Sequence, residues 1–520
     1  MSDRLRNLCV CSYDLEVEFD KNHMGEQRGE ILVATVVCSC GFSFVGTSRD
    51  SNYPGAKQYS SSSDICMEMI IAITKHRPYF LVGHNVYEFD NVVMLSHLVG
   101  AHSNDRRMKF DQLFMDISGN TQFGFAMRCM ITIPGINNLD TLVWFRSTMG
   151  TAFDSYSLDS LAEQEGIYGK HKGVKFSVDM DREAYISLIL YNVRDCRIVL
   201  ELCERRSVVD NVIEMCSQSG ATFRDVALYN TGVIGACAVS RYCLVETHRK
   251  FNWRTCTTII DVIRGGTVAF ERCMMRRHVF GLDVNSLYPS VVVSGGISPD
   301  SAVIRDIPVI GREIEECLSD GKDVRQEVVF GLAKDSIAAA ACRSMVGRRV
   351  IARSEGKANL QWSLKIIANS IYGVLAYSKY PSFSPLCASC ITGTGRWLLE
   401  VLLVVSSAYP GCSVVYGDTD SALSSYDERD DWTIPSQHLP LSNEKRKDMC
   451  MRAIDGISDI FSMVLSFTPF TNVKLSPVKP ADPNVGPVYD SILVLGSKRY
   501  AMRDSLGNLT VVGGASVRRN

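Results

Sequence analysis

The segment VVYGDTDSAL, residues 414–423, constrains this chain more than any other. An apolar run precedes Asp418 and Asp420, and small residues follow them. This order predicts two strands joined by a tight turn that carries both carboxylates. Carboxylates held rigidly in this way suit Mg²⁺, which prefers oxygen ligands. Because acidic pairs in turns are more often ordinary solvated turns, the segment alone does not establish a metal site.

The composition predicts several cored domains in a reducing location. The chain has 520 residues, of which 46% are hydrophobic, and a length of this kind corresponds to about three to four domains. Its net charge of -2 gives no overall attraction to polyanions, so a nucleic-acid site requires a local basic patch. The first residues, MSDRLRNLCVCSYDLEVEF, do not resemble a secretory signal, which favours an intracellular compartment.

Two further patterns point to core positions. The apolar run WLLEVLLVV at 397–405 is too short for a bilayer and contains Glu400, so we expect a core helix and no transmembrane segment. The chain contains 19 cysteines, and two close pairs stand out, Cys38 with Cys40 and Cys387 with Cys390. These pairs would suggest zinc only with histidines and further cysteines in reach, so we interpret them as buried thiols.

The first third of the chain places acids on regular elements. Residues 8–19 alternate as a strand, which puts Asp14 and Glu16 on one face, about 6.6 to 6.8 Å apart. We expect a second strand at 31–45 and a loop at 47–64, then a helix at 65–76 and a strand at 79–85. A helix would follow with Asp90 near that strand's carboxyl end, and after it a hairpin-like region at 107–147. On the long helix predicted at 182–206, Tyr191 and Asp195 share a face. Each acid also has a structural interpretation without chemistry: Asp14 and Glu16 could lie on a solvated edge strand, and Asp195 could be a surface residue.

The later part of the chain predicts a strand at 279–290 that carries Asp283 beside a turn closed by Pro289. Two helices, at 336–353 and 360–377, would form a hairpin. On the second helix a polar stripe runs opposite apolar positions. It consists of Gln361, Lys365, Asn369 and Tyr372. Because a solvated face normally carries Glu and Lys, this stripe indicates a binding surface.

Taken in order, these segments resemble the family B DNA polymerases. DVNSLYPS at 283–290, KIIANSIYG at 365–373 and YGDTDS at 416–421 are similar to the family's three polymerase motifs. RGGTV at 264–268 and SKRY at 497–500 are similar to its YxGG and KKRY elements, although Ser497 replaces the first lysine. Upstream, DLE at 14–16, HNVYEFD at 84–90 and YNVRD at 191–195 resemble its three exonuclease motifs.

The resemblance implies a multidomain α/β and α+β fold. It would comprise an RNase H-like 3'-5' exonuclease domain, a palm built on a ferredoxin-like sheet, and a helical-hairpin fingers insertion. The expected ranges are 1–215 for the exonuclease domain, 216–262 for a helical connector, 263–332 and 378–520 for the palm, and 333–377 for the fingers. The resemblance further implies that the chain has neither a thumb nor the family's usual N-terminal domain.

The resemblance also assigns roles residue by residue. In the polymerase site Asp283 and Asp420 would bind metal, with Asp418 as an essential neighbour. The nucleotide would be bound by Leu287, Tyr288, Arg349, Arg353, Lys365, Asn369, Tyr372 and Gly373, with Tyr288 excluding a 2'-hydroxyl. DNA would be contacted by Gly265, Gly266, Lys498, Arg499 and Tyr500. In the exonuclease site Asp14, Glu16, Asp90 and Asp195 would bind metal while Tyr191 positions the attacking water.

The implied function is template-directed DNA synthesis with proofreading in DNA replication, using two Mg²⁺ ions at each active site. The implied partners are primer-template DNA, dNTPs, and a processivity factor or a chain that supplies a thumb, without a membrane. Short spacings between the motifs favour a nucleic-acid primer over a protein primer. The compact form resembles viral enzymes, which would place it in a host nucleus. The alternative is an exonuclease or incomplete polymerase subunit that needs a thumb from another chain.

Overall fold

The computed structural model describes thirteen stretches of the chain, and the chain divides into two compact units. The described stretches are 8–18, 29–100, 114–118, 128–149, 155–167, 180–248, 265–270, 274–308, 324–330, 336–376, 383–426, 443–480 and 485–512. Unit 1 contains Met1–Ile213 and Thr222–Tyr229, and unit 2 contains Glu214–Ala221 and Asn230–Asn520.

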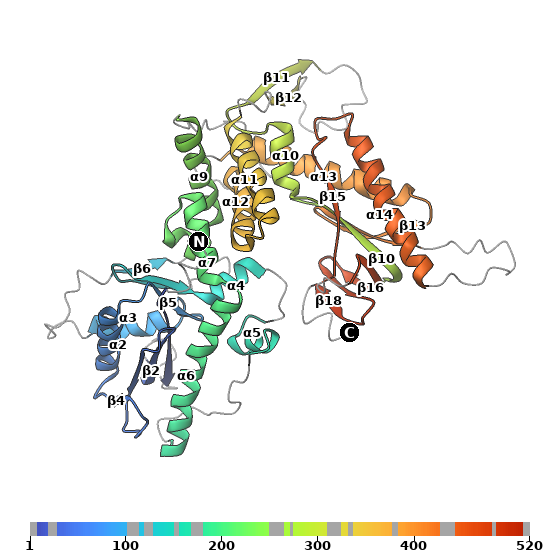
Figure 1. Cartoon of the computed structure of the whole chain (residues 1–520). Coiled ribbons are helices and arrows are strands. Elements are labelled where there is room, and N and C mark those ends of the chain that lie inside the picture. Colours follow the sequence, from blue (N-terminus) through green and yellow to red (C-terminus); the bar gives the residue numbers. More distant parts are fainter. Residues whose placement is uncertain are drawn as a thin grey trace. The chain divides into compact units, whose positions relative to one another are not determined.

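Unit 1 is built on a six-stranded mixed sheet in the order β4-β3-β2-β1-β5-β8 (Figure 1). β1 pairs antiparallel with β2 and parallel with β5, so it lies at the centre of the sheet. A separate hairpin joins β6 and β7. The bounds are β1 Val10–Glu18, β2 Glu30–Cys38, β3 Ser43–Thr47, β4 Ala56–Gln58, β5 Phe80–Gly83, β6 Phe114–Ser118, β7 Arg128–Thr132 and β8 Asn137–Asp140.

Helices pack on the sheet of unit 1, with α2 and α3 to one side of the strands and the long α6 to the other (Figure 1). One face of α6 packs on β2, because apolar residues three and four apart lie on the same side of a helix. The buried contacts join Tyr185, Leu188 and Ile189 of α6 to Leu32 and Val33 of β2. The bounds are α2 Ser62–His76, α3 Asp90–Gly100, α4 Thr141–Met149, α5 Leu158–Gln164, α6 Arg182–Arg205 and α8 Phe223–Ala227, while α7 Val208–Ser219 has residues in both units.

Three predictions for unit 1 were incomplete. The strand predicted at 31–45 is a hairpin of β2 and β3, since Gly41 adopts a φ of 94° in the turn between them. The loop predicted at 47–64 contains β4 and the first turn of α2, whose N–H groups are capped by Ser61. The hairpin predicted at 107–147 includes β6 and β7, but its last part forms β8 and α4.

Unit 2 is built on an eight-stranded sheet in the order β18-β17-β16-β10-β14-β13-β9, with β15 also paired to β10. Neighbouring strands are antiparallel. A separate hairpin joins β11 and β12. The bounds are β9 Val268–Phe270, β10 Met274–Val284, β11 Ala302–Pro308, β12 Val324–Phe330, β13 Cys412–Asp418, β14 Ser421–Tyr426, β15 Leu475–Pro477, β16 Val488–Gly496, β17 Arg499–Arg503 and β18 Leu509–Val512.

The helices of unit 2 form two groups. α13 and α14 pack on the sheet, whereas α11 and α12 form the predicted helical hairpin and α9 packs against both. Gly235 permits that contact, because a Cβ there would lie 2.6 Å from the Ser370 carbonyl oxygen. The bounds are α9 Thr231–Tyr242, the π-helical turn η2 Cys243–Thr247, α10 Leu287–Gly295, α11 Ile337–Ser354, α12 Ala358–Ala376, α13 Pro385–Ala408 and α14 Asn443–Leu465.

Two predictions for unit 2 were wrong in detail. The strand predicted at 279–290 ends at Val284, and α10 begins at Leu287. Pro289 lies in the first turn of α10, where its missing N–H leaves no hydrogen bond unmade. The final segment forms three strands and not two, because the chain reverses at Lys498, which has a φ of 54°.

The apolar run at 397–405 belongs to a longer helix than the sequence suggested. α13 has 24 residues and is apolar enough to cross a bilayer by length and composition alone, a test that core helices also pass. In unit 2 it packs against α10, α12, α14, β13 and β14. Its packing therefore agrees with the core helix predicted from the run.

Candidate active sites

Three acids of unit 2 meet at the strand-turn-strand predicted at 414–423. Asp283 of β10 and Asp418 of β13 both pair with Ser421 of β14, one from each side. Asp420 lies in the turn between β13 and β14, and its carbonyl accepts a 2.7 Å hydrogen bond from the Val284 N–H. The strand register thus brings the three carboxyl-bearing residues to one end of the sheet.

The turn itself is held from two directions. Thr419 has a φ of 52°, and its N–H donates to the Thr267 carbonyl at 3.0 Å. Gly266 lies close enough that a Cβ there would come within 2.7 Å of the Thr419 hydroxyl oxygen. Close backbone approach, predicted for the glycine pair, therefore occurs at Gly266, whereas a Cβ on Gly265 would meet nothing within 4 Å.

Hydrogen bonds occupy both oxygens of Asp418. The Thr419 hydroxyl donates to Oδ1 at 2.9 Å, and the Tyr416 hydroxyl donates to Oδ2 at 3.2 Å. The Tyr416 oxygen in turn accepts the Lys498 N–H at 2.9 Å. This chain of contacts connects the SKRY turn to the acidic turn, and it holds Asp418 differently from its two neighbours.

Burial and neighbouring carboxylates raise the pKa of the acids of this site, and nearby lysines oppose that rise. Burial, and then the Asp420 charge, raises the pKa of Asp283 to about 7. Burial and the Asp418 charge also raise the pKa of Asp420. Lys365 lowers the pKa of both carboxyls, and Lys498 lowers that of Asp420. A cation from the second hairpin helix therefore acts on the acids, as a site for anionic substrates requires.

The predicted polar stripe of α12 is confirmed. Lys365 and Asn369 are exposed, while Leu364, Ile367 and Ile371 on the opposite face are buried. Tyr372 continues the stripe, and its ring stacks on that of Tyr288 at 4.5 Å and 25°. The two aromatic residues predicted to contact the nucleotide thus lie together, and they connect α10 to α12.

The other predicted nucleotide residues lie on the same helices. Arg349 of α11 donates a 2.7 Å hydrogen bond to the Ser286 hydroxyl at the start of α10, and burial and Arg353 lower its pKa. Arg353 is exposed one turn later. Leu287 is buried, and a Cβ on Gly373 would meet nothing within 4 Å.

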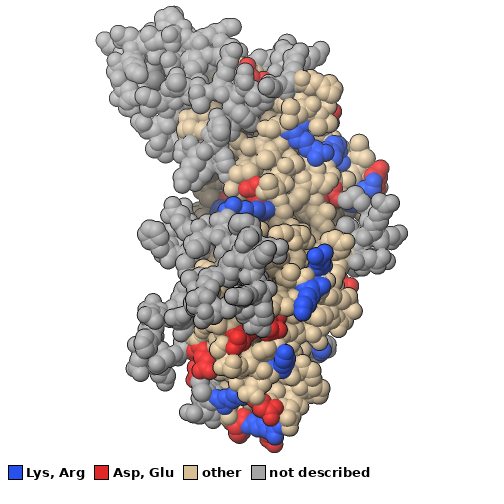
Figure 2. Space-filling model, turned by 90° about the vertical axis from the view of Figure 1, so that its left-hand side faces the viewer, with Lys and Arg blue, Asp and Glu red and all other residues tan. Residues whose placement is uncertain are grey.

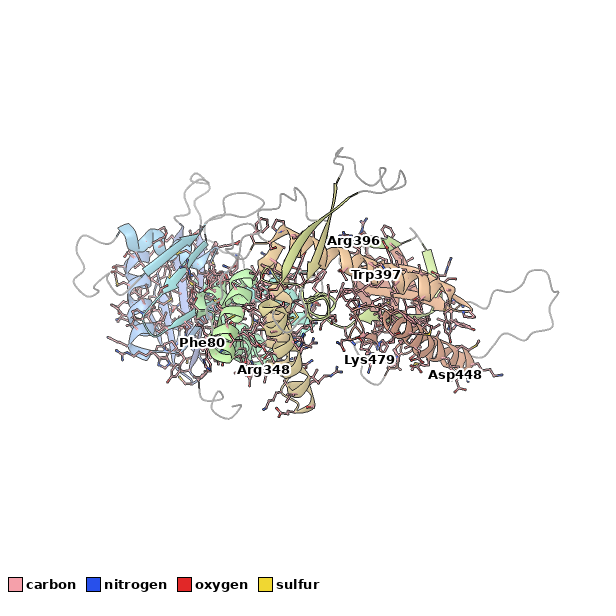
Figure 3. The ribbon with its side chains drawn as sticks, turned by 90° about the horizontal axis from the view of Figure 1, so that it is seen from above. Phe80, Arg348, Arg396, Trp397, Asp448 and Lys479 are labelled. Carbon is pink, nitrogen blue, oxygen red and sulfur yellow. The ribbon has the colours of Figure 1, made fainter. Side chains whose placement is uncertain are left out.

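Sequence reasoning missed Arg396, which lies on α13 (Figure 3). Its guanidinium donates to the Gly265 carbonyl at 2.9 Å. Burial raises the pKa of Tyr288 and of Tyr372, and the Arg396 charge opposes that rise. A signal was present in the sequence, because Arg396 and Glu400 are the two charged residues of this apolar helix. Tyr416 was also missed, since its place in an apolar run indicated only a core residue.

The acids of unit 1 form a second cluster. Carboxylate oxygens of Asp14, Glu16 and Asp195 lie within 4.8 Å of one another. Asp14 and Glu16 come from β1, and Asp195 comes from the buried face of α6. The Asn192 side-chain amide donates to Asp14 at 2.7 Å. Sequence reasoning missed Asn192, although it lies three residues before Asp195, one turn away on the same helix.

The fourth predicted acid is placed differently. Asp90 begins α3, is buried, and accepts the Leu15 N–H at 2.9 Å between the two acids of β1. Burial, and to a lesser extent the charge of the nearby Asp140, raises the pKa of Asp90 to about 7. Asp140 accepts the Asn85 and Tyr87 N–H groups, so it shapes the loop before α3. Tyr191 is half-buried on α6, one turn before Asp195.

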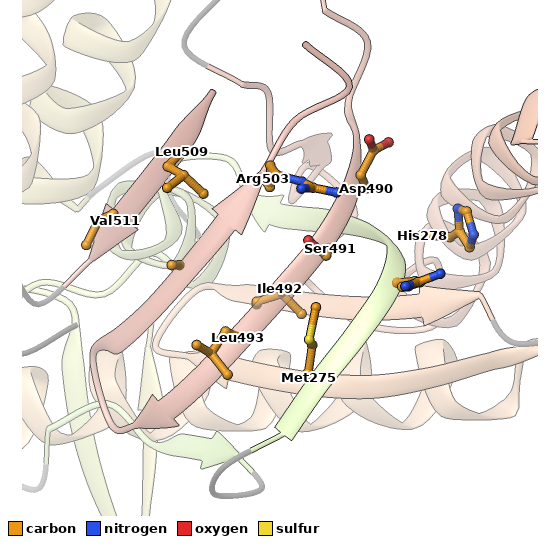
Figure 4. A pocket seen from close by; sticks show the side chains of 11 residues that line it. Met275, His278, Asp490, Ser491, Ile492, Leu493, Arg503, Leu509 and Val511 are labelled. Carbon is orange, nitrogen blue, oxygen red and sulfur yellow. The ribbon is translucent and has the colours of Figure 1, made fainter. Parts of the chain in front are cut away.

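Neither the charges on the face shown in Figure 2 nor the hollow described below locates the acidic clusters. On the face shown in Figure 2, the described Lys and Arg side chains form small separate groups, which agrees with the expected local patches. A hollow lies over β10, β16, β17 and β18 of unit 2 (Figure 4). Its lining includes Met275, His278, Asp490 and Arg503, and none of the predicted site residues. The candidate active sites are therefore located by the acidic clusters and not by the hollow.

Comparisons with known families match both halves of the chain. The model described as DNA polymerase family B matches residues 234–433. The model described as DNA polymerase family B, exonuclease domain, matches residues 6–161. The first range contains Asp283, Lys365 and Asp420, and the second contains Asp14 and Asp90.

Individual relatives agree with the family models. The chain is 25% identical over 391 residues to a DNA polymerase of Paramecium bursaria Chlorella virus NY2A, covering 66% of this chain and 41% of the relative. It is 25% identical to DNA polymerase II of Escherichia coli, covering 70% of this chain and 45% of the relative. The structure of the family B DNA polymerase from Pyrobaculum calidifontis has a TM-score of 0.65 at 20% identity, and the match covers 98% of this chain and 60% of that one.

These matches confirm the predicted fold class, a nuclease-type sheet unit followed by a palm-type sheet unit with a helical hairpin. The chain spans less than two thirds of the length of each of these proteins.

Proposed function

This chain belongs to the family B DNA polymerases, and from that membership we propose that it extends DNA primers on a template during DNA replication and removes mispaired 3' ends. Polymerisation is assigned to unit 2, with the sheet as palm and α11–α12 as fingers. Proofreading is assigned to unit 1. The proposed substrates are primer-template DNA and dNTPs.

One observation carries the polymerase assignment. Asp283, Asp418 and Asp420 converge at one end of three adjacent strands, and the charge of Lys365 acts on two of them. A plain acidic turn has no need of a cation from a separate helix. Paired carboxylates opposed by a lysine support a site that binds both metal ions and a polyphosphate.

The donor set fits divalent cations. Asp283 and Asp420 offer carboxylate oxygens in unit 2, and Asp14, Glu16 and Asp195 offer them in unit 1. Oxygen ligands alone favour Mg²⁺ over softer metals. Such ions, when bound, activate the attacking oxygen and stabilise the charge on the leaving group. Asp418, whose oxygens already accept two hydroxyl hydrogen bonds, would position the turn and contribute negative charge.

The remaining residues would bind and orient the nucleotide. Lys365, with Arg349 and Arg353 on the facing helix, would hold the triphosphate through charge-assisted hydrogen bonds. Tyr288, stacked on Tyr372, would form a wall under the sugar and exclude a 2'-hydroxyl. Asn369 would support the incoming nucleotide, and Gly373 would leave room beside the base pair.

DNA would be bound near the SKRY turn. Lys498 and Arg499 are exposed, and the Lys498 N–H contacts Tyr416 next to the acids. Tyr500 packs against the Tyr416 ring at 4.9 Å. Contacts of this kind to the backbone would give affinity without sequence preference. Gly265 and Gly266 would allow close approach of the template strand.

In unit 1, Asp14, Glu16 and Asp195 would hold metal, with Asp90 behind them on the Leu15 amide. Asn192 would orient Asp14, and Tyr191 would position the attacking water. Both roles rest on α6, a rigid helix of 24 residues packed on the sheet.

The direct test supplies the purified chain with Mg²⁺ and a labelled primer, either annealed to a template with dNTPs or single-stranded without them. Extension of the annealed primer together with 3' shortening of the single strand is the expected result. Shortening without extension would favour an exonuclease that needs a further chain for synthesis. Absence of both activities would overturn the proposal.

A further inference from the structure

A cluster of three cysteines and one histidine lies at one end of the unit 1 sheet. Cys9 comes just before β1, Cys38 ends β2, Cys40 lies in the turn to β3, and His76 ends α2. The sequence pattern favoured buried thiols for Cys38 and Cys40, because no histidine or second pair stood nearby. The fold corrects this interpretation by bringing in Cys9 and His76, 29 and 38 residues from Cys38.

All six distances among the four donor atoms are short. The three sulfur–sulfur distances are 3.0 Å for Cys9–Cys38, 3.8 Å for Cys9–Cys40 and 3.3 Å for Cys38–Cys40. The His76 Nε2 lies 3.1 Å from Cys9, 3.3 Å from Cys38 and 3.4 Å from Cys40. Four atoms that are all mutual neighbours define the corners of a tetrahedron.

This tetrahedron is close to the one that zinc requires and somewhat smaller. Zinc bonds of about 2.3 Å to sulfur and about 2.0 to 2.1 Å to nitrogen imply edges of about 3.8 Å between sulfurs and about 3.6 Å between sulfur and nitrogen. The Cys9–Cys40 distance of 3.8 Å matches, the three sulfur–nitrogen distances of 3.1 to 3.4 Å are slightly shorter, and the Cys9–Cys38 distance of 3.0 Å is the shortest. They are far longer than the sulfur–sulfur bond of a disulfide, which is about 2.05 Å.

The surrounding structure orients the four side chains. Gly41, with its φ of 94°, turns the chain so that Cys38 and Cys40 face the same centre. The Ser39 N–H donates to the Val10 carbonyl at 2.9 Å, which ties the turn to β1 beside Cys9. The Phe42 ring stacks on the His76 imidazole at 4.1 Å and 11°, which fixes the orientation of the ring. Such outer contacts are typical of metal sites.

We propose that Cys9, Cys38, Cys40 and His76 bind one structural Zn²⁺ ion. Four protein donors fill a tetrahedral site, so no position is left open for a substrate. The site is separate from the acidic cluster, because Asp14 lies five residues after Cys9, about 17 Å along the strand. It joins the start of β1, the β2–β3 turn and the end of α2, and so it clamps the strand that carries Asp14 and Glu16.

The test measures metal in the full-length chain, purified without chelator and under reducing conditions. Elemental analysis should find one zinc per chain in the unmodified protein and none in Cys40→Ser, whose thiol is exposed and whose loss spares the core. Cys40→His, which restores a donor, should recover zinc. Cys390→Ser, which removes a half-buried thiol on α13, should keep the full content.

Two further measurements distinguish a bound zinc ion from a cluster of metal-free thiols. Cobalt exchanged into the site should give the visible absorption of tetrahedral thiolate coordination, and Cys40→Ser should lose it. Adding a chelator should lower Tm by several degrees for the unmodified chain and leave Cys40→Ser unchanged. Absence of zinc from the unmodified chain, or a zinc content equal in the unmodified chain and Cys40→Ser, would overturn the proposal.

Discussion

The two acidic clusters of this chain are assembled in different ways. In unit 2 the acids come from adjacent strands, and cations act on them, since Lys365 lowers the pKa of Asp283 and Asp420. In unit 1, Asp14 and Glu16 come from a strand and Asp195 from a helix, and two neutral donors reach acids of this unit, the Asn192 amide at Asp14 and the Leu15 N–H at Asp90. The charge that acts on Asp90 is that of another carboxyl, Asp140. A cation beside the acids suits the triphosphate substrate proposed for unit 2, whereas the substrate proposed for unit 1 is a phosphodiester.

The strongest test of this comparison removes one acid from each site. Asp420→Ala should lower primer extension by at least about a thousandfold and spare degradation of single-stranded DNA, because a direct metal position is lost in unit 2 alone. Asp14→Ala should produce the reverse pattern. Both activities are measured on the same labelled primer.

An equal loss of both activities in either variant would break the two-site interpretation. Ser421→Ala serves as the control, because this residue lies between Asp283 and Asp418 in the sheet but offers no carboxylate. It should retain both activities to within a fewfold.

A smaller effect is expected from the cation that distinguishes the sites. Lys365→Ala should lower kcat/KM for dNTP by about a hundredfold, since a charge-assisted contact to the triphosphate is lost. It should also move the pH profile of extension upward. A protonated carboxyl cannot bind metal, so extension at limiting Mg²⁺ falls as pH drops through about 7, the pKa of Asp283. Without Lys365 that pKa is higher, and the fall begins at higher pH.

The pH profile of exonuclease activity should not move in Lys365→Ala, because Lys365 acts on Asp283 and Asp420, whereas that activity is assigned to the acids of unit 1. Lys357→Ala removes an exposed lysine from the turn between α11 and α12 and should leave both profiles unchanged. A shift of the exonuclease profile in Lys365→Ala would show that the two sites are not independent.

Removing the Tyr288 ring should change the preference for deoxyribose over ribose and leave the rate of dNTP incorporation nearly unchanged. Tyr288→Ala should lower the preference for dNTP over rNTP by about thirtyfold, because the ring stacked on Tyr372 no longer blocks the 2'-hydroxyl. The measurement is the ratio of kcat/KM for the two sugars. Tyr288→Phe keeps the ring and should keep the preference, and equal preference in all three proteins would remove this role.

Local sequence patterns explain why part of the unit 2 site could be predicted. Asp418 ends β13 and Asp420 lies two residues later in the turn, and the spacing of four residues along α12 places Lys365 and Asn369 on one face. Local patterns therefore determine them. Arg396 and Tyr416 act on the site from α13 and from within a core strand, and their roles depend on packing that no local pattern specifies.

The same reasoning applies to unit 1. Asp14 and Glu16 share a strand face and could be placed from alternation alone, whereas Asn192 joins them through the packing of α6 on β1. Cys9 and His76 meet Cys38 only because three elements end at the same edge of the sheet. Long-range convergence of this kind has no signature in a single sequence.

The smallest predicted effect concerns the hydroxyl that connects two motifs of unit 2. Tyr416→Phe removes the hydrogen bond to Asp418 and leaves the Lys498 N–H without its acceptor, while the ring keeps its packing. Extension should fall by about threefold to tenfold, as expected when a contact that positions the carboxylates of a metal site is lost, and exonuclease activity should be unchanged. Tyr489→Phe, in the same buried cluster, serves as the matched control. If the two variants behave alike, the Tyr416 hydroxyl does not position the acidic turn, and Thr419 and the strand pairing hold it instead. The difference between the two acidic clusters would then rest on Lys365.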